Sequence, residues 1–260
     1  MRFAKLHGLG NDFVLLDLRA DAGARPPGTS RAAALCDRHR GIGADGVLTL
    51  LSGDRLVIHN ADGSVPEMCG NGARCAALWI ATAGCTRPAS ALVRLETDAG
   101  PRPCQVRAET AVHAMVEVEM GVPDIAPPRD LAGGFRAIAV SVGNPHRVIF
   151  TDAPRERLRD LALRVGPDLS RAEDANVEFV ARLGGGRYAA AVWERGAGLT
   201  QACGTGACAV AAAALTRGET APEISVELPG GELIIRRDPA TGQLRMRGPA
   251  QLIYTGDLAI

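Results

Sequence analysis

Two copies of one short motif decide the organisation of this chain: Cys-Gly-Asn-Gly-Ala at residues 69–73 and Cys-Gly-Thr-Gly-Ala at residues 203–207. An alanine-rich apolar run follows each motif, at residues 74–80 and 208–215. The glycines end any preceding strand, and each run is long enough for a buried helix. Each motif therefore places a cysteine near a helix N-terminus, where unpaired backbone N–H groups and the helix dipole favour thiolate over thiol.

The motifs belong to a longer internal repeat. Asn11 lies 58 residues before Cys69, and Asn144 lies 59 residues before Cys203. A repeat of about 134 residues is one domain duplicated, not a solenoid of short units. Both cysteine motifs are therefore expected to face one shared cleft. A further polar residue stands nine positions before each cysteine: Asn60 in the first half and Glu194 in the second.

The repeat predicts two domains. The first covers residues 1–119, and residues 249–260 are expected to return to it as a C-terminal strand. The second covers residues 120–248, and the proline-rich segment 121–128 is the candidate linker.

Short β-branched or alternating segments dominate the chain and predict strands. Helices are predicted at residues 31–38, with Ser30 as the N-cap, and at residues 158–165, ending before Gly166 and Pro167. Many strands around one apolar helix in each half favour an α+β fold over a doubly wound parallel sheet.

Composition excludes several classes of function. Basic and acidic residues number 29 each, so the chain has no net field to attract nucleic acid or an anionic membrane. Aromatic residues make up 3%, too few for the stacking surfaces of single-strand binders. The N-terminus lacks a signal-peptide core, and the apolar run at residues 207–215 is far too short to span a membrane. We expect a cytoplasmic protein with no nucleic-acid or membrane partner.

Cysteine and lysine usage argues against metals and cofactors. The seven cysteines include no C-x-x-C pair, which argues against a disulfide framework and a structural zinc site. Lys5 is the only lysine. Pyridoxal phosphate (PLP) enzymes need a Schiff-base lysine, and Lys5 does not lie in such a context. We therefore expect no cofactor.

An ordered set of motifs resembles the diaminopimelate epimerase family along nearly the whole chain. A lone C-G-x-G would be a weak signal, because proline racemases carry similar motifs, but the full set at these spacings is specific. The matching segments are residues 7–13, 41–45, 60–64, 68–75, 143–146, 176–177, 194–198 and 202–206.

The resemblance implies two pseudo-symmetric domains, each a mostly antiparallel sheet wrapped around a central α-helix, with the active site in the interdomain cleft. It also implies a homodimer. The implied reaction is the PLP-independent inversion of one stereocentre, which interconverts L,L- and meso-2,6-diaminopimelate for lysine and peptidoglycan biosynthesis.

Inversion needs a base and an acid on opposite faces of one carbon. Cys69 and Cys203 suit these roles, because a thiol pKa of about 8.5 is easily tuned to the working pH. The backbone N–H groups of Gly70, Asn71, Gly204 and Thr205 could receive the reacting carboxylate. By resemblance, six side chains bind the substrate: Asn11, Asn60, Asn144, Asn176, Glu194 and Arg195. The remaining cysteines are predicted to be small buried hydrophobic residues: Cys36, Cys75, Cys85, Cys104 and Cys208.

Two other functions stay open at this point. Gly46 stands where some family members carry Gln, and Leu199 and Val65 replace a common Glu, so a PLP-independent racemase of another amino acid, such as histidine, is an alternative. A non-catalytic binding protein is a third hypothesis, and the presence of both cysteines argues against it.

Overall fold

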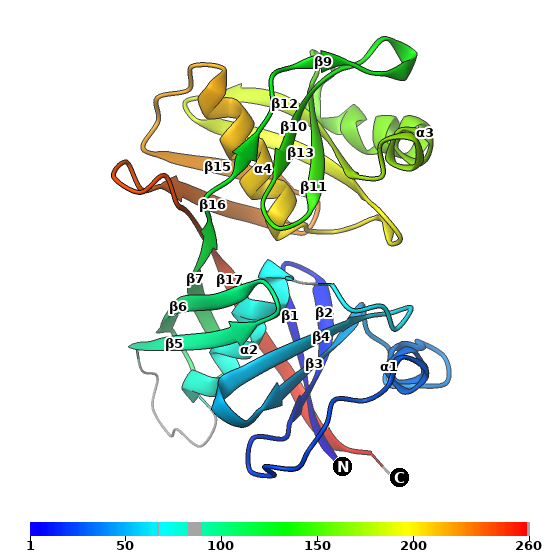
Figure 1. Ribbon diagram of the computed structural model, residues 1–260, viewed down its shortest axis with the longest axis vertical. Coiled ribbons are helices and arrows are strands. Elements are labelled where there is room, and N and C mark those ends of the chain that lie inside the picture. The colour runs from blue at the N-terminus through cyan, green and yellow to red at the C-terminus, as the bar shows by residue number, and fades with distance from the viewer. Residues whose placement is uncertain (67, 83–89, 259–260) are drawn as a thin grey trace. The chain divides into compact units, whose positions relative to one another are not determined.

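The chain divides into two compact units (Figure 1). Unit 1 comprises Met1–Val118 and Gly248–Ile260, and unit 2 comprises Glu119–Arg247. The computed structural model describes residues 1–66, 68–82 and 90–258, so the expectation for Cys85 lies outside the described residues.

The chain passes from unit 1 to unit 2 inside strand β7 (His113–Gly121), not in the predicted linker at residues 121–128. Buried and half-buried residues alternate along β7 to its end, so the strand continues across the boundary. Within the predicted linker, β8 (Asp124–Ile125) pairs with β10 (Arg136–Ser141), which makes this segment part of unit 2.

The sheet of unit 1 closes on itself. Its other strands are β1 (Arg2–Gly8), β2 (Asn11–Asp17), β3 (Gly46–Leu51), β4 (Arg55–Asn60), β5 (Ser90–Thr97), β6 (Gly100–Ala108) and β17 (Leu244–Asp257). They pair in the order β17–β1–β2–β3–β4–β5–β6–β7, and β7 pairs with β17. The steps β2–β3 and β4–β5 are parallel. The hairpins β1–β2, β3–β4, β5–β6 and β6–β7 are antiparallel.

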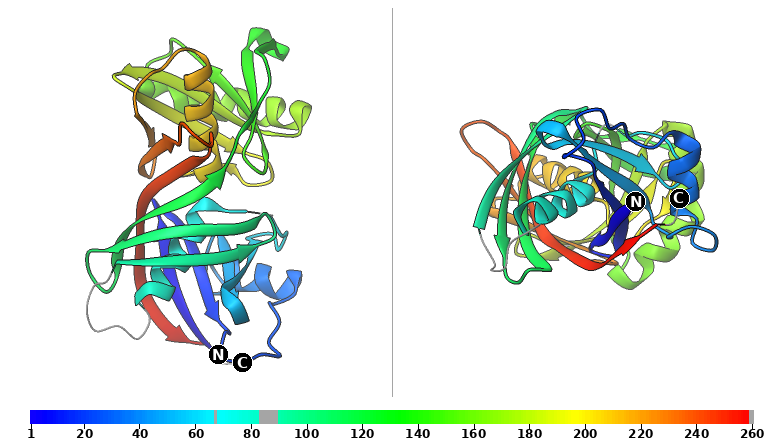
Figure 2. Two further views of the ribbon diagram at one scale, coloured as in Figure 1. Left: turned by 60° about the vertical axis from the view of Figure 1, so that its left-hand side comes forward. Right: turned by 90° about the horizontal axis from the view of Figure 1, so that it is seen from below.

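One helix fills unit 1 and another lies outside its sheet. Helix α2 (Gly70–Thr82) is buried at every residue from Gly70 to Leu78 and contacts strands β1 to β6 (Figure 2, right). Helix α1 (Thr29–Cys36) covers the outer face of β3 and β4. Between those two strands lies a short 3₁₀ helix, Ser52–Asp54.

Unit 2 repeats this plan. Its elements are β8, β9 (Arg129–Asp130), the 3₁₀ helix Ala132–Gly134, β10, β11 (Pro145–Phe150), α3 (Arg155–Glu173), β12 (Asn176–Gly184), β13 (Arg187–Glu194), β14 (Gly198–Leu199), α4 (Gly204–Thr216), β15 (Glu223–Leu228) and β16 (Gly231–Arg237). The step β11–β12 is parallel across the outer helix α3, and the step β13–β15 is parallel across the central helix α4. The hairpins β10–β11, β12–β13 and β15–β16 are antiparallel. The predicted fold class, two pseudo-symmetric α+β domains with mostly antiparallel sheets around a central helix, is confirmed.

Helix α1 begins and ends two residues earlier than predicted. Gly28, in an extended conformation, is the N-cap, so Ser30 lies inside the helix and does not cap it. Asp37 ends the helix because its Oδ1 accepts the backbone N–H groups of His39 and Arg40 and holds the chain in a turn.

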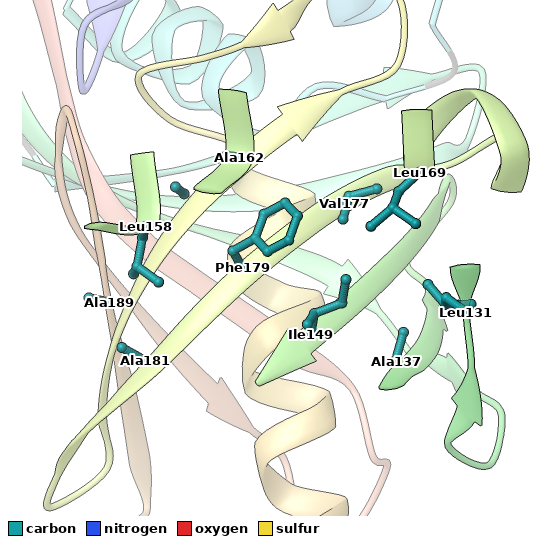
Figure 3. Packing of buried hydrophobic residues seen from close by; sticks show 11 residues of the cluster. Leu131, Ala137, Ile149, Leu158, Ala162, Leu169, Val177, Phe179, Ala181 and Ala189 are labelled. Atoms are coloured by element: carbon teal, nitrogen blue, oxygen red, sulfur yellow. The ribbon is translucent and has the colours of Figure 1, made fainter. Parts of the chain in front are cut away.

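Helix α3 continues past the glycine and proline at which the sequence predicts its end. Leu158 and Ala162 before Pro167, and Leu169 after it, all pack into the core between α3 and the sheet of unit 2 (Figure 3). Phe179 on β12 lies at the centre of that core and is fully buried. Burying one such side chain stabilises a fold by roughly 1.5–3 kcal/mol, so packing on both sides of Pro167 outweighs the hydrogen bond that proline removes.

Gly166 provides a test of this packing. A Cβ atom at this position would lie 2.7 Å from Cβ and 2.8 Å from Cγ of Trp193 on β13. Overpacking of this kind costs about 1–3 kcal/mol, and replacing a helical glycine returns up to about 1 kcal/mol. We expect Gly166→Ala to lower the free energy of unfolding by about 1 kcal/mol in urea titrations. Leu163→Ala, at an exposed position of the same helix, is the control, and equal stability of both variants would contradict the packing.

Across residues 1–66, 68–82 and 90–258, no helix is long and apolar enough to cross a membrane.

Candidate active site

The two cysteines occupy equivalent positions in the two units. Cys69 directly precedes α2, and Cys203 is the N-cap of α4. The N–H of Gly72 donates to Cys69 Sγ at 3.4 Å, and the N–H of Gly206 donates to Cys203 Sγ at 3.4 Å. The predicted placement of each cysteine at a helix N-terminus is confirmed. The helices begin with Gly70 and Asn71 in α2 and with Gly204 and Thr205 in α4, at the end of a helix where backbone N–H groups point outward along the axis.

In unit 1 the predicted residues Asn11 and Asn71 contact each other. Nδ2 of Asn71, in the first turn of α2, donates to Oδ1 of Asn11 at 3.0 Å. Nδ2 of Asn11 donates in turn to Oδ2 of Asp45 at 2.9 Å. The Asn11 carboxamide is therefore fixed next to the start of the helix that Cys69 precedes.

Asn60 lies on the same edge of the sheet as Asn11. It ends β4 opposite Gly46, which begins β3 beside the start of β2. Its Nδ2 donates to Oγ of Ser64 at 2.9 Å, and its side chain is exposed. A Cβ at Gly46 would lie 2.6 Å from the carbonyl oxygen of His59, so this chain has no room for a glutamine there unless β4 moves.

Asn11 is connected through Asp45 to a network of charged side chains. Lys5 is buried and pairs with Asp12 at 2.5 Å, and it also donates to the carbonyl oxygen of Gly43. Arg38 bridges Asp12 and Asp45, at 2.7 and 2.8 Å. The only lysine of the chain is thus held in an ion pair. Neither Asp45 nor Arg38 was singled out from the sequence, although Asp45 lies in the matching segment 41–45.

This network gives stability a specific pH dependence. Burial alone would raise the pKa of Asp12, but hydrogen bonds from Arg38 and Lys5 lower it to about 2, from an ordinary value of 3.8. Because the folded-state pKa is lowered, the ion pair stabilises the fold above about pH 4, and that stabilisation is lost as the pH falls through about 2. The contribution is about 2 kcal/mol. In urea titrations, Asp12→Asn should therefore be less stable at neutral pH and lose less stability in acid than the parent. Asp168→Asn, at an exposed carboxylate, should keep the parental acid sensitivity.

In unit 2 the surroundings of Cys203 disfavour the thiolate. Burial raises the pKa of Cys203 well above its ordinary value, and the charges of Glu194 and Glu178 raise this pKa further. The expectation that the helix N-terminus favours the thiolate therefore does not hold at Cys203, because desolvation and two carboxylates outweigh the helix dipole. Burial also raises the pKa of Glu194, while Thr200 and Cys203 donate hydrogen bonds to its carboxylate.

Asn144 contacts the buried side chain of His146, which in turn contacts the buried side chain of Glu178. Nε2 of His146 lies 3.0 Å from Oδ1 of Asn144, and Nδ1 of His146 lies 2.6 Å from Oε1 of Glu178. The imidazole and carboxylate side chains are both fully buried. The sequence analysis did not identify Glu178. A signal was present, because Glu178 is the one charged residue in the apolar segment Val177–Val180.

Asn176 and Arg195 are also brought together. The backbone N–H of Arg195 donates to Oδ1 of Asn176 at 2.8 Å. The guanidinium of Arg195 is half-exposed and pairs with Asp174 at 3.0 Å, so its present partner is on the surface. Asn176 begins β12 opposite His146 on β11, which places it on the same sheet edge as Asn144.

The structure shows the surroundings of Leu199 and Val65, the two residues that stand where family members commonly carry Glu. Leu199 on β14 packs against the core between α3 and the sheet of unit 2, so an apolar side chain suits that position. Val65 is exposed. The other predicted structural cysteines within the described residues, Cys36, Cys75, Cys104 and Cys208, are all buried. Among the described residues, no three His, Cys, Asp or Glu side chains are grouped as a metal site requires.

Comparisons with known proteins agree with this architecture. The family model described as diaminopimelate epimerase matches residues 3–126 and 138–253. A diaminopimelate epimerase from Synechococcus sp. is 41% identical, covering 100% of this chain and 98% of that protein. A diaminopimelate epimerase from Desulforudis audaxviator is 40% identical, covering 98% of each. Among solved structures, a predicted epimerase from Pseudomonas aeruginosa matches with a TM-score of 0.75 at 17% identity, covering 100% of this chain and 99% of that one.

The two-domain fold with a cysteine at the start of each central helix, together with full-length relatives that are epimerases, defines an isomerase of the epimerase class. Within that class, the chain belongs to the diaminopimelate epimerase family.

Proposed function

We propose that this protein is a diaminopimelate epimerase, an isomerase that interconverts L,L- and meso-2,6-diaminopimelate by a PLP-independent reaction with two cysteines. The observation that carries the proposal is the matched pair of cysteines, each with its sulfur over the first turn of a central helix. Full-length relatives named for this activity support it. They do not favour a racemase of another amino acid. In the cell, the reaction would supply lysine and peptidoglycan synthesis.

The proposed reaction transfers one proton on each face of the α-carbon. Because its surroundings favour the thiol, Cys203 starts as the proton donor. Cys69 starts as the thiolate, removes the α-proton from one face and becomes a thiol. Cys203 then protonates the carbanion from the opposite face and becomes a thiolate. The reverse direction exchanges the two roles.

The N-termini of helices α2 and α4 stabilise the negative charge of the carbanion intermediate. The carbanion next to a carboxylate places negative charge on the carboxylate oxygens. The N–H groups of Gly70, Asn71, Gly204 and Thr205 are the proposed donors to that carboxylate, and fixed donors of this kind are among the strongest catalytic devices in proteins. They supply this stabilisation in place of a cofactor.

The remaining side chains are proposed to recognise the rest of the substrate. Asn11, Asn60, Asn144 and Asn176 offer carboxamides, Glu194 offers a carboxylate for an ammonium group, and Arg195 can exchange Asp174 for a substrate carboxylate. A homodimer and a cytoplasmic location remain predictions, and sedimentation analysis would test the first.

The deciding experiment follows L,L-diaminopimelate in D₂O by NMR with the reduced protein. We expect loss of the α-proton signal and formation of the meso isomer. L-histidine under the same conditions should stay unchanged. Binding of diaminopimelate without exchange would contradict the proposal and favour the binding-protein hypothesis.

Mild oxidation tests whether both thiols reach one carbon. Two thiols that act on one carbon should come close enough to form a Cys69–Cys203 disulfide in the absence of substrate. Peptide mass spectrometry should detect this cross-link, and substrate should suppress it. Oxidation that joins other cysteines and never this pair would contradict the two-cysteine mechanism.

A further inference from the structure

Glu178 in unit 2 is a buried carboxylate that transfers no proton in the proposed reaction. Glu178 on β12 faces the first turn of α4, since a Cβ at Gly206 would lie 3.0 Å from its Oε1. The same oxygen lies 2.6 Å from Nδ1 of His146, and both side chains are 0% exposed. Nε2 of His146 lies 3.0 Å from Oδ1 of Asn144. The contacts therefore run from the buried Glu178 through His146 to Asn144, which is proposed to bind substrate.

Counting donors and acceptors links the states of these three side chains. If Glu178 is ionised and Oδ1 of Asn144 faces the ring, both partners are acceptors only, and each ring nitrogen of His146 carries a hydrogen. The imidazole is then an imidazolium, and its charge is balanced by Glu178. Glu194 on β13 also interacts electrostatically with His146, and it adds no positive charge. Buried charges persist when they are paired, and here Oε1 of Glu178 pairs with the ring, while its Oε2 is buried without a hydrogen-bond partner among the described residues.

The orientation of Asn144 and that charge depend on each other. While His146 donates from Nε2, the Oδ1 atom of Asn144 is held toward the interior and its NH₂ group is directed away from His146. A neutral imidazole that donates to Glu178 would keep only a lone pair on Nε2. The carboxamide would then turn over to donate to it, and Asn144 would present an acceptor in place of a donor.

Unit 1 fixes the equivalent asparagine in the same sense with different residues. Oδ1 of Asn11 accepts from Nδ2 of Asn71, and its NH₂ group donates to Asp45 with one N–H remaining. In both units the carboxamide oxygen is therefore used inside the protein, and an N–H is what remains for a ligand. Such a donor recognises a carboxylate and rejects an ammonium group.

We propose that Glu178 is a positioning residue: through the charge on His146, it holds the Asn144 carboxamide with its NH₂ group toward a carboxylate of the substrate. This inference rests on the proposed function for the identity of the substrate. The state of His146 itself does not depend on it.

The first measurement is the ¹⁵N NMR spectrum of histidine-labelled protein near neutral pH, with the His146 signals assigned by their loss in His146→Gln. We expect both ring nitrogens of His146 to be protonated in the parent protein. In Glu178→Gln one of them should lose its proton, because the carboxylate that balances the charge is gone. Glu178→Asp, which keeps the charge, should restore the doubly protonated ring at least in part.

The second measurement is steady-state kinetics with diaminopimelate. Loss of a hydrogen bond to a charged group weakens binding about tenfold, so KM should rise about tenfold in Glu178→Gln and recover in Glu178→Asp. An unprotonated ring nitrogen in the parent protein would overturn the proposal even if Glu178→Gln does not fold. An unchanged His146 spectrum with unchanged KM in folded Glu178→Gln would also overturn it. If diaminopimelate is not a substrate, no KM can be measured, but the NMR spectrum still tests the protonation of His146.

Discussion

Replacing Cys203 with alanine should lower the rate of diaminopimelate epimerisation about a thousandfold, and Cys69→Ala should do the same. A positioned acid or base contributes roughly 10²–10⁴-fold, and inversion needs both groups in every turnover. Each sulfur accepts one backbone N–H at 3.4 Å from the first turn of a helix that is buried over most of its length, so truncation removes the proton carrier and one cap hydrogen bond while the packing of the helix remains. NMR or a coupled assay of the meso isomer would measure the loss.

Cys208→Ala is the matched control for these variants. Cys208 lies in α4, five residues after the N-cap Cys203, and is fully buried, yet it has no proposed role in catalysis. It should keep nearly the full rate. Each catalytic variant should also retain deuterium exchange into one epimer, because one base remains on one face. Full activity in either Cys69→Ala or Cys203→Ala would end the two-cysteine mechanism.

The sequence predicts those features of the fold that depend on short-range patterns. Gly-rich motifs followed by alanine runs correctly predict the starts of both central helices. The spacing of Asn11 and Asn144 to their cysteines correctly predicts the repeat, because Asn11 begins β2 in unit 1 and Asn144 directly precedes β11 in unit 2. Helix α3 was predicted too short because the pattern rules treat Gly166 and Pro167 as a stop. Packing against Trp193 and the core instead carries the helix past them, and local sequence does not report such contacts.

The candidate site was predicted less completely than the fold. Residues expected to contact the substrate were named from the sequence, and the residues that hold them in place were not. Asp45 reaches Asn11 from 34 positions away, and Glu178 reaches His146 from 32 positions away. The thiolate expectation at Cys203 failed because it considered only the N-terminus of the helix. Burial in the folded chain raises the pKa of Cys203, and the charges of Glu194 and Glu178 on neighbouring strands raise it further.

Replacing Glu194 with glutamine should separate the reactivity of Cys203 from catalysis. Burial raises the pKa of Cys203, and the charge of Glu194 raises this pKa further, so the uncharged variant should have a lower thiol pKa. At a fixed pH near neutral, a larger fraction of Cys203 would then be thiolate, and iodoacetamide should alkylate it faster. Mass spectrometry of the peptide that contains Cys203 would give that rate across a pH series.

Epimerisation should move the other way and fall about a hundredfold, because the Cys203 thiol loses the carboxylate that accepts its hydrogen bond. Thr200→Val is the matched comparison, since it removes the hydroxyl that donates to Glu194 at 2.5 Å but leaves the carboxylate in place. That variant should lose less activity and should not acquire faster alkylation. If alkylation of Cys203 in Glu194→Gln were unchanged or slower, the charge of Glu194 would not act on the thiol, and the assignment of Cys203 as the initial proton donor would rest on burial alone.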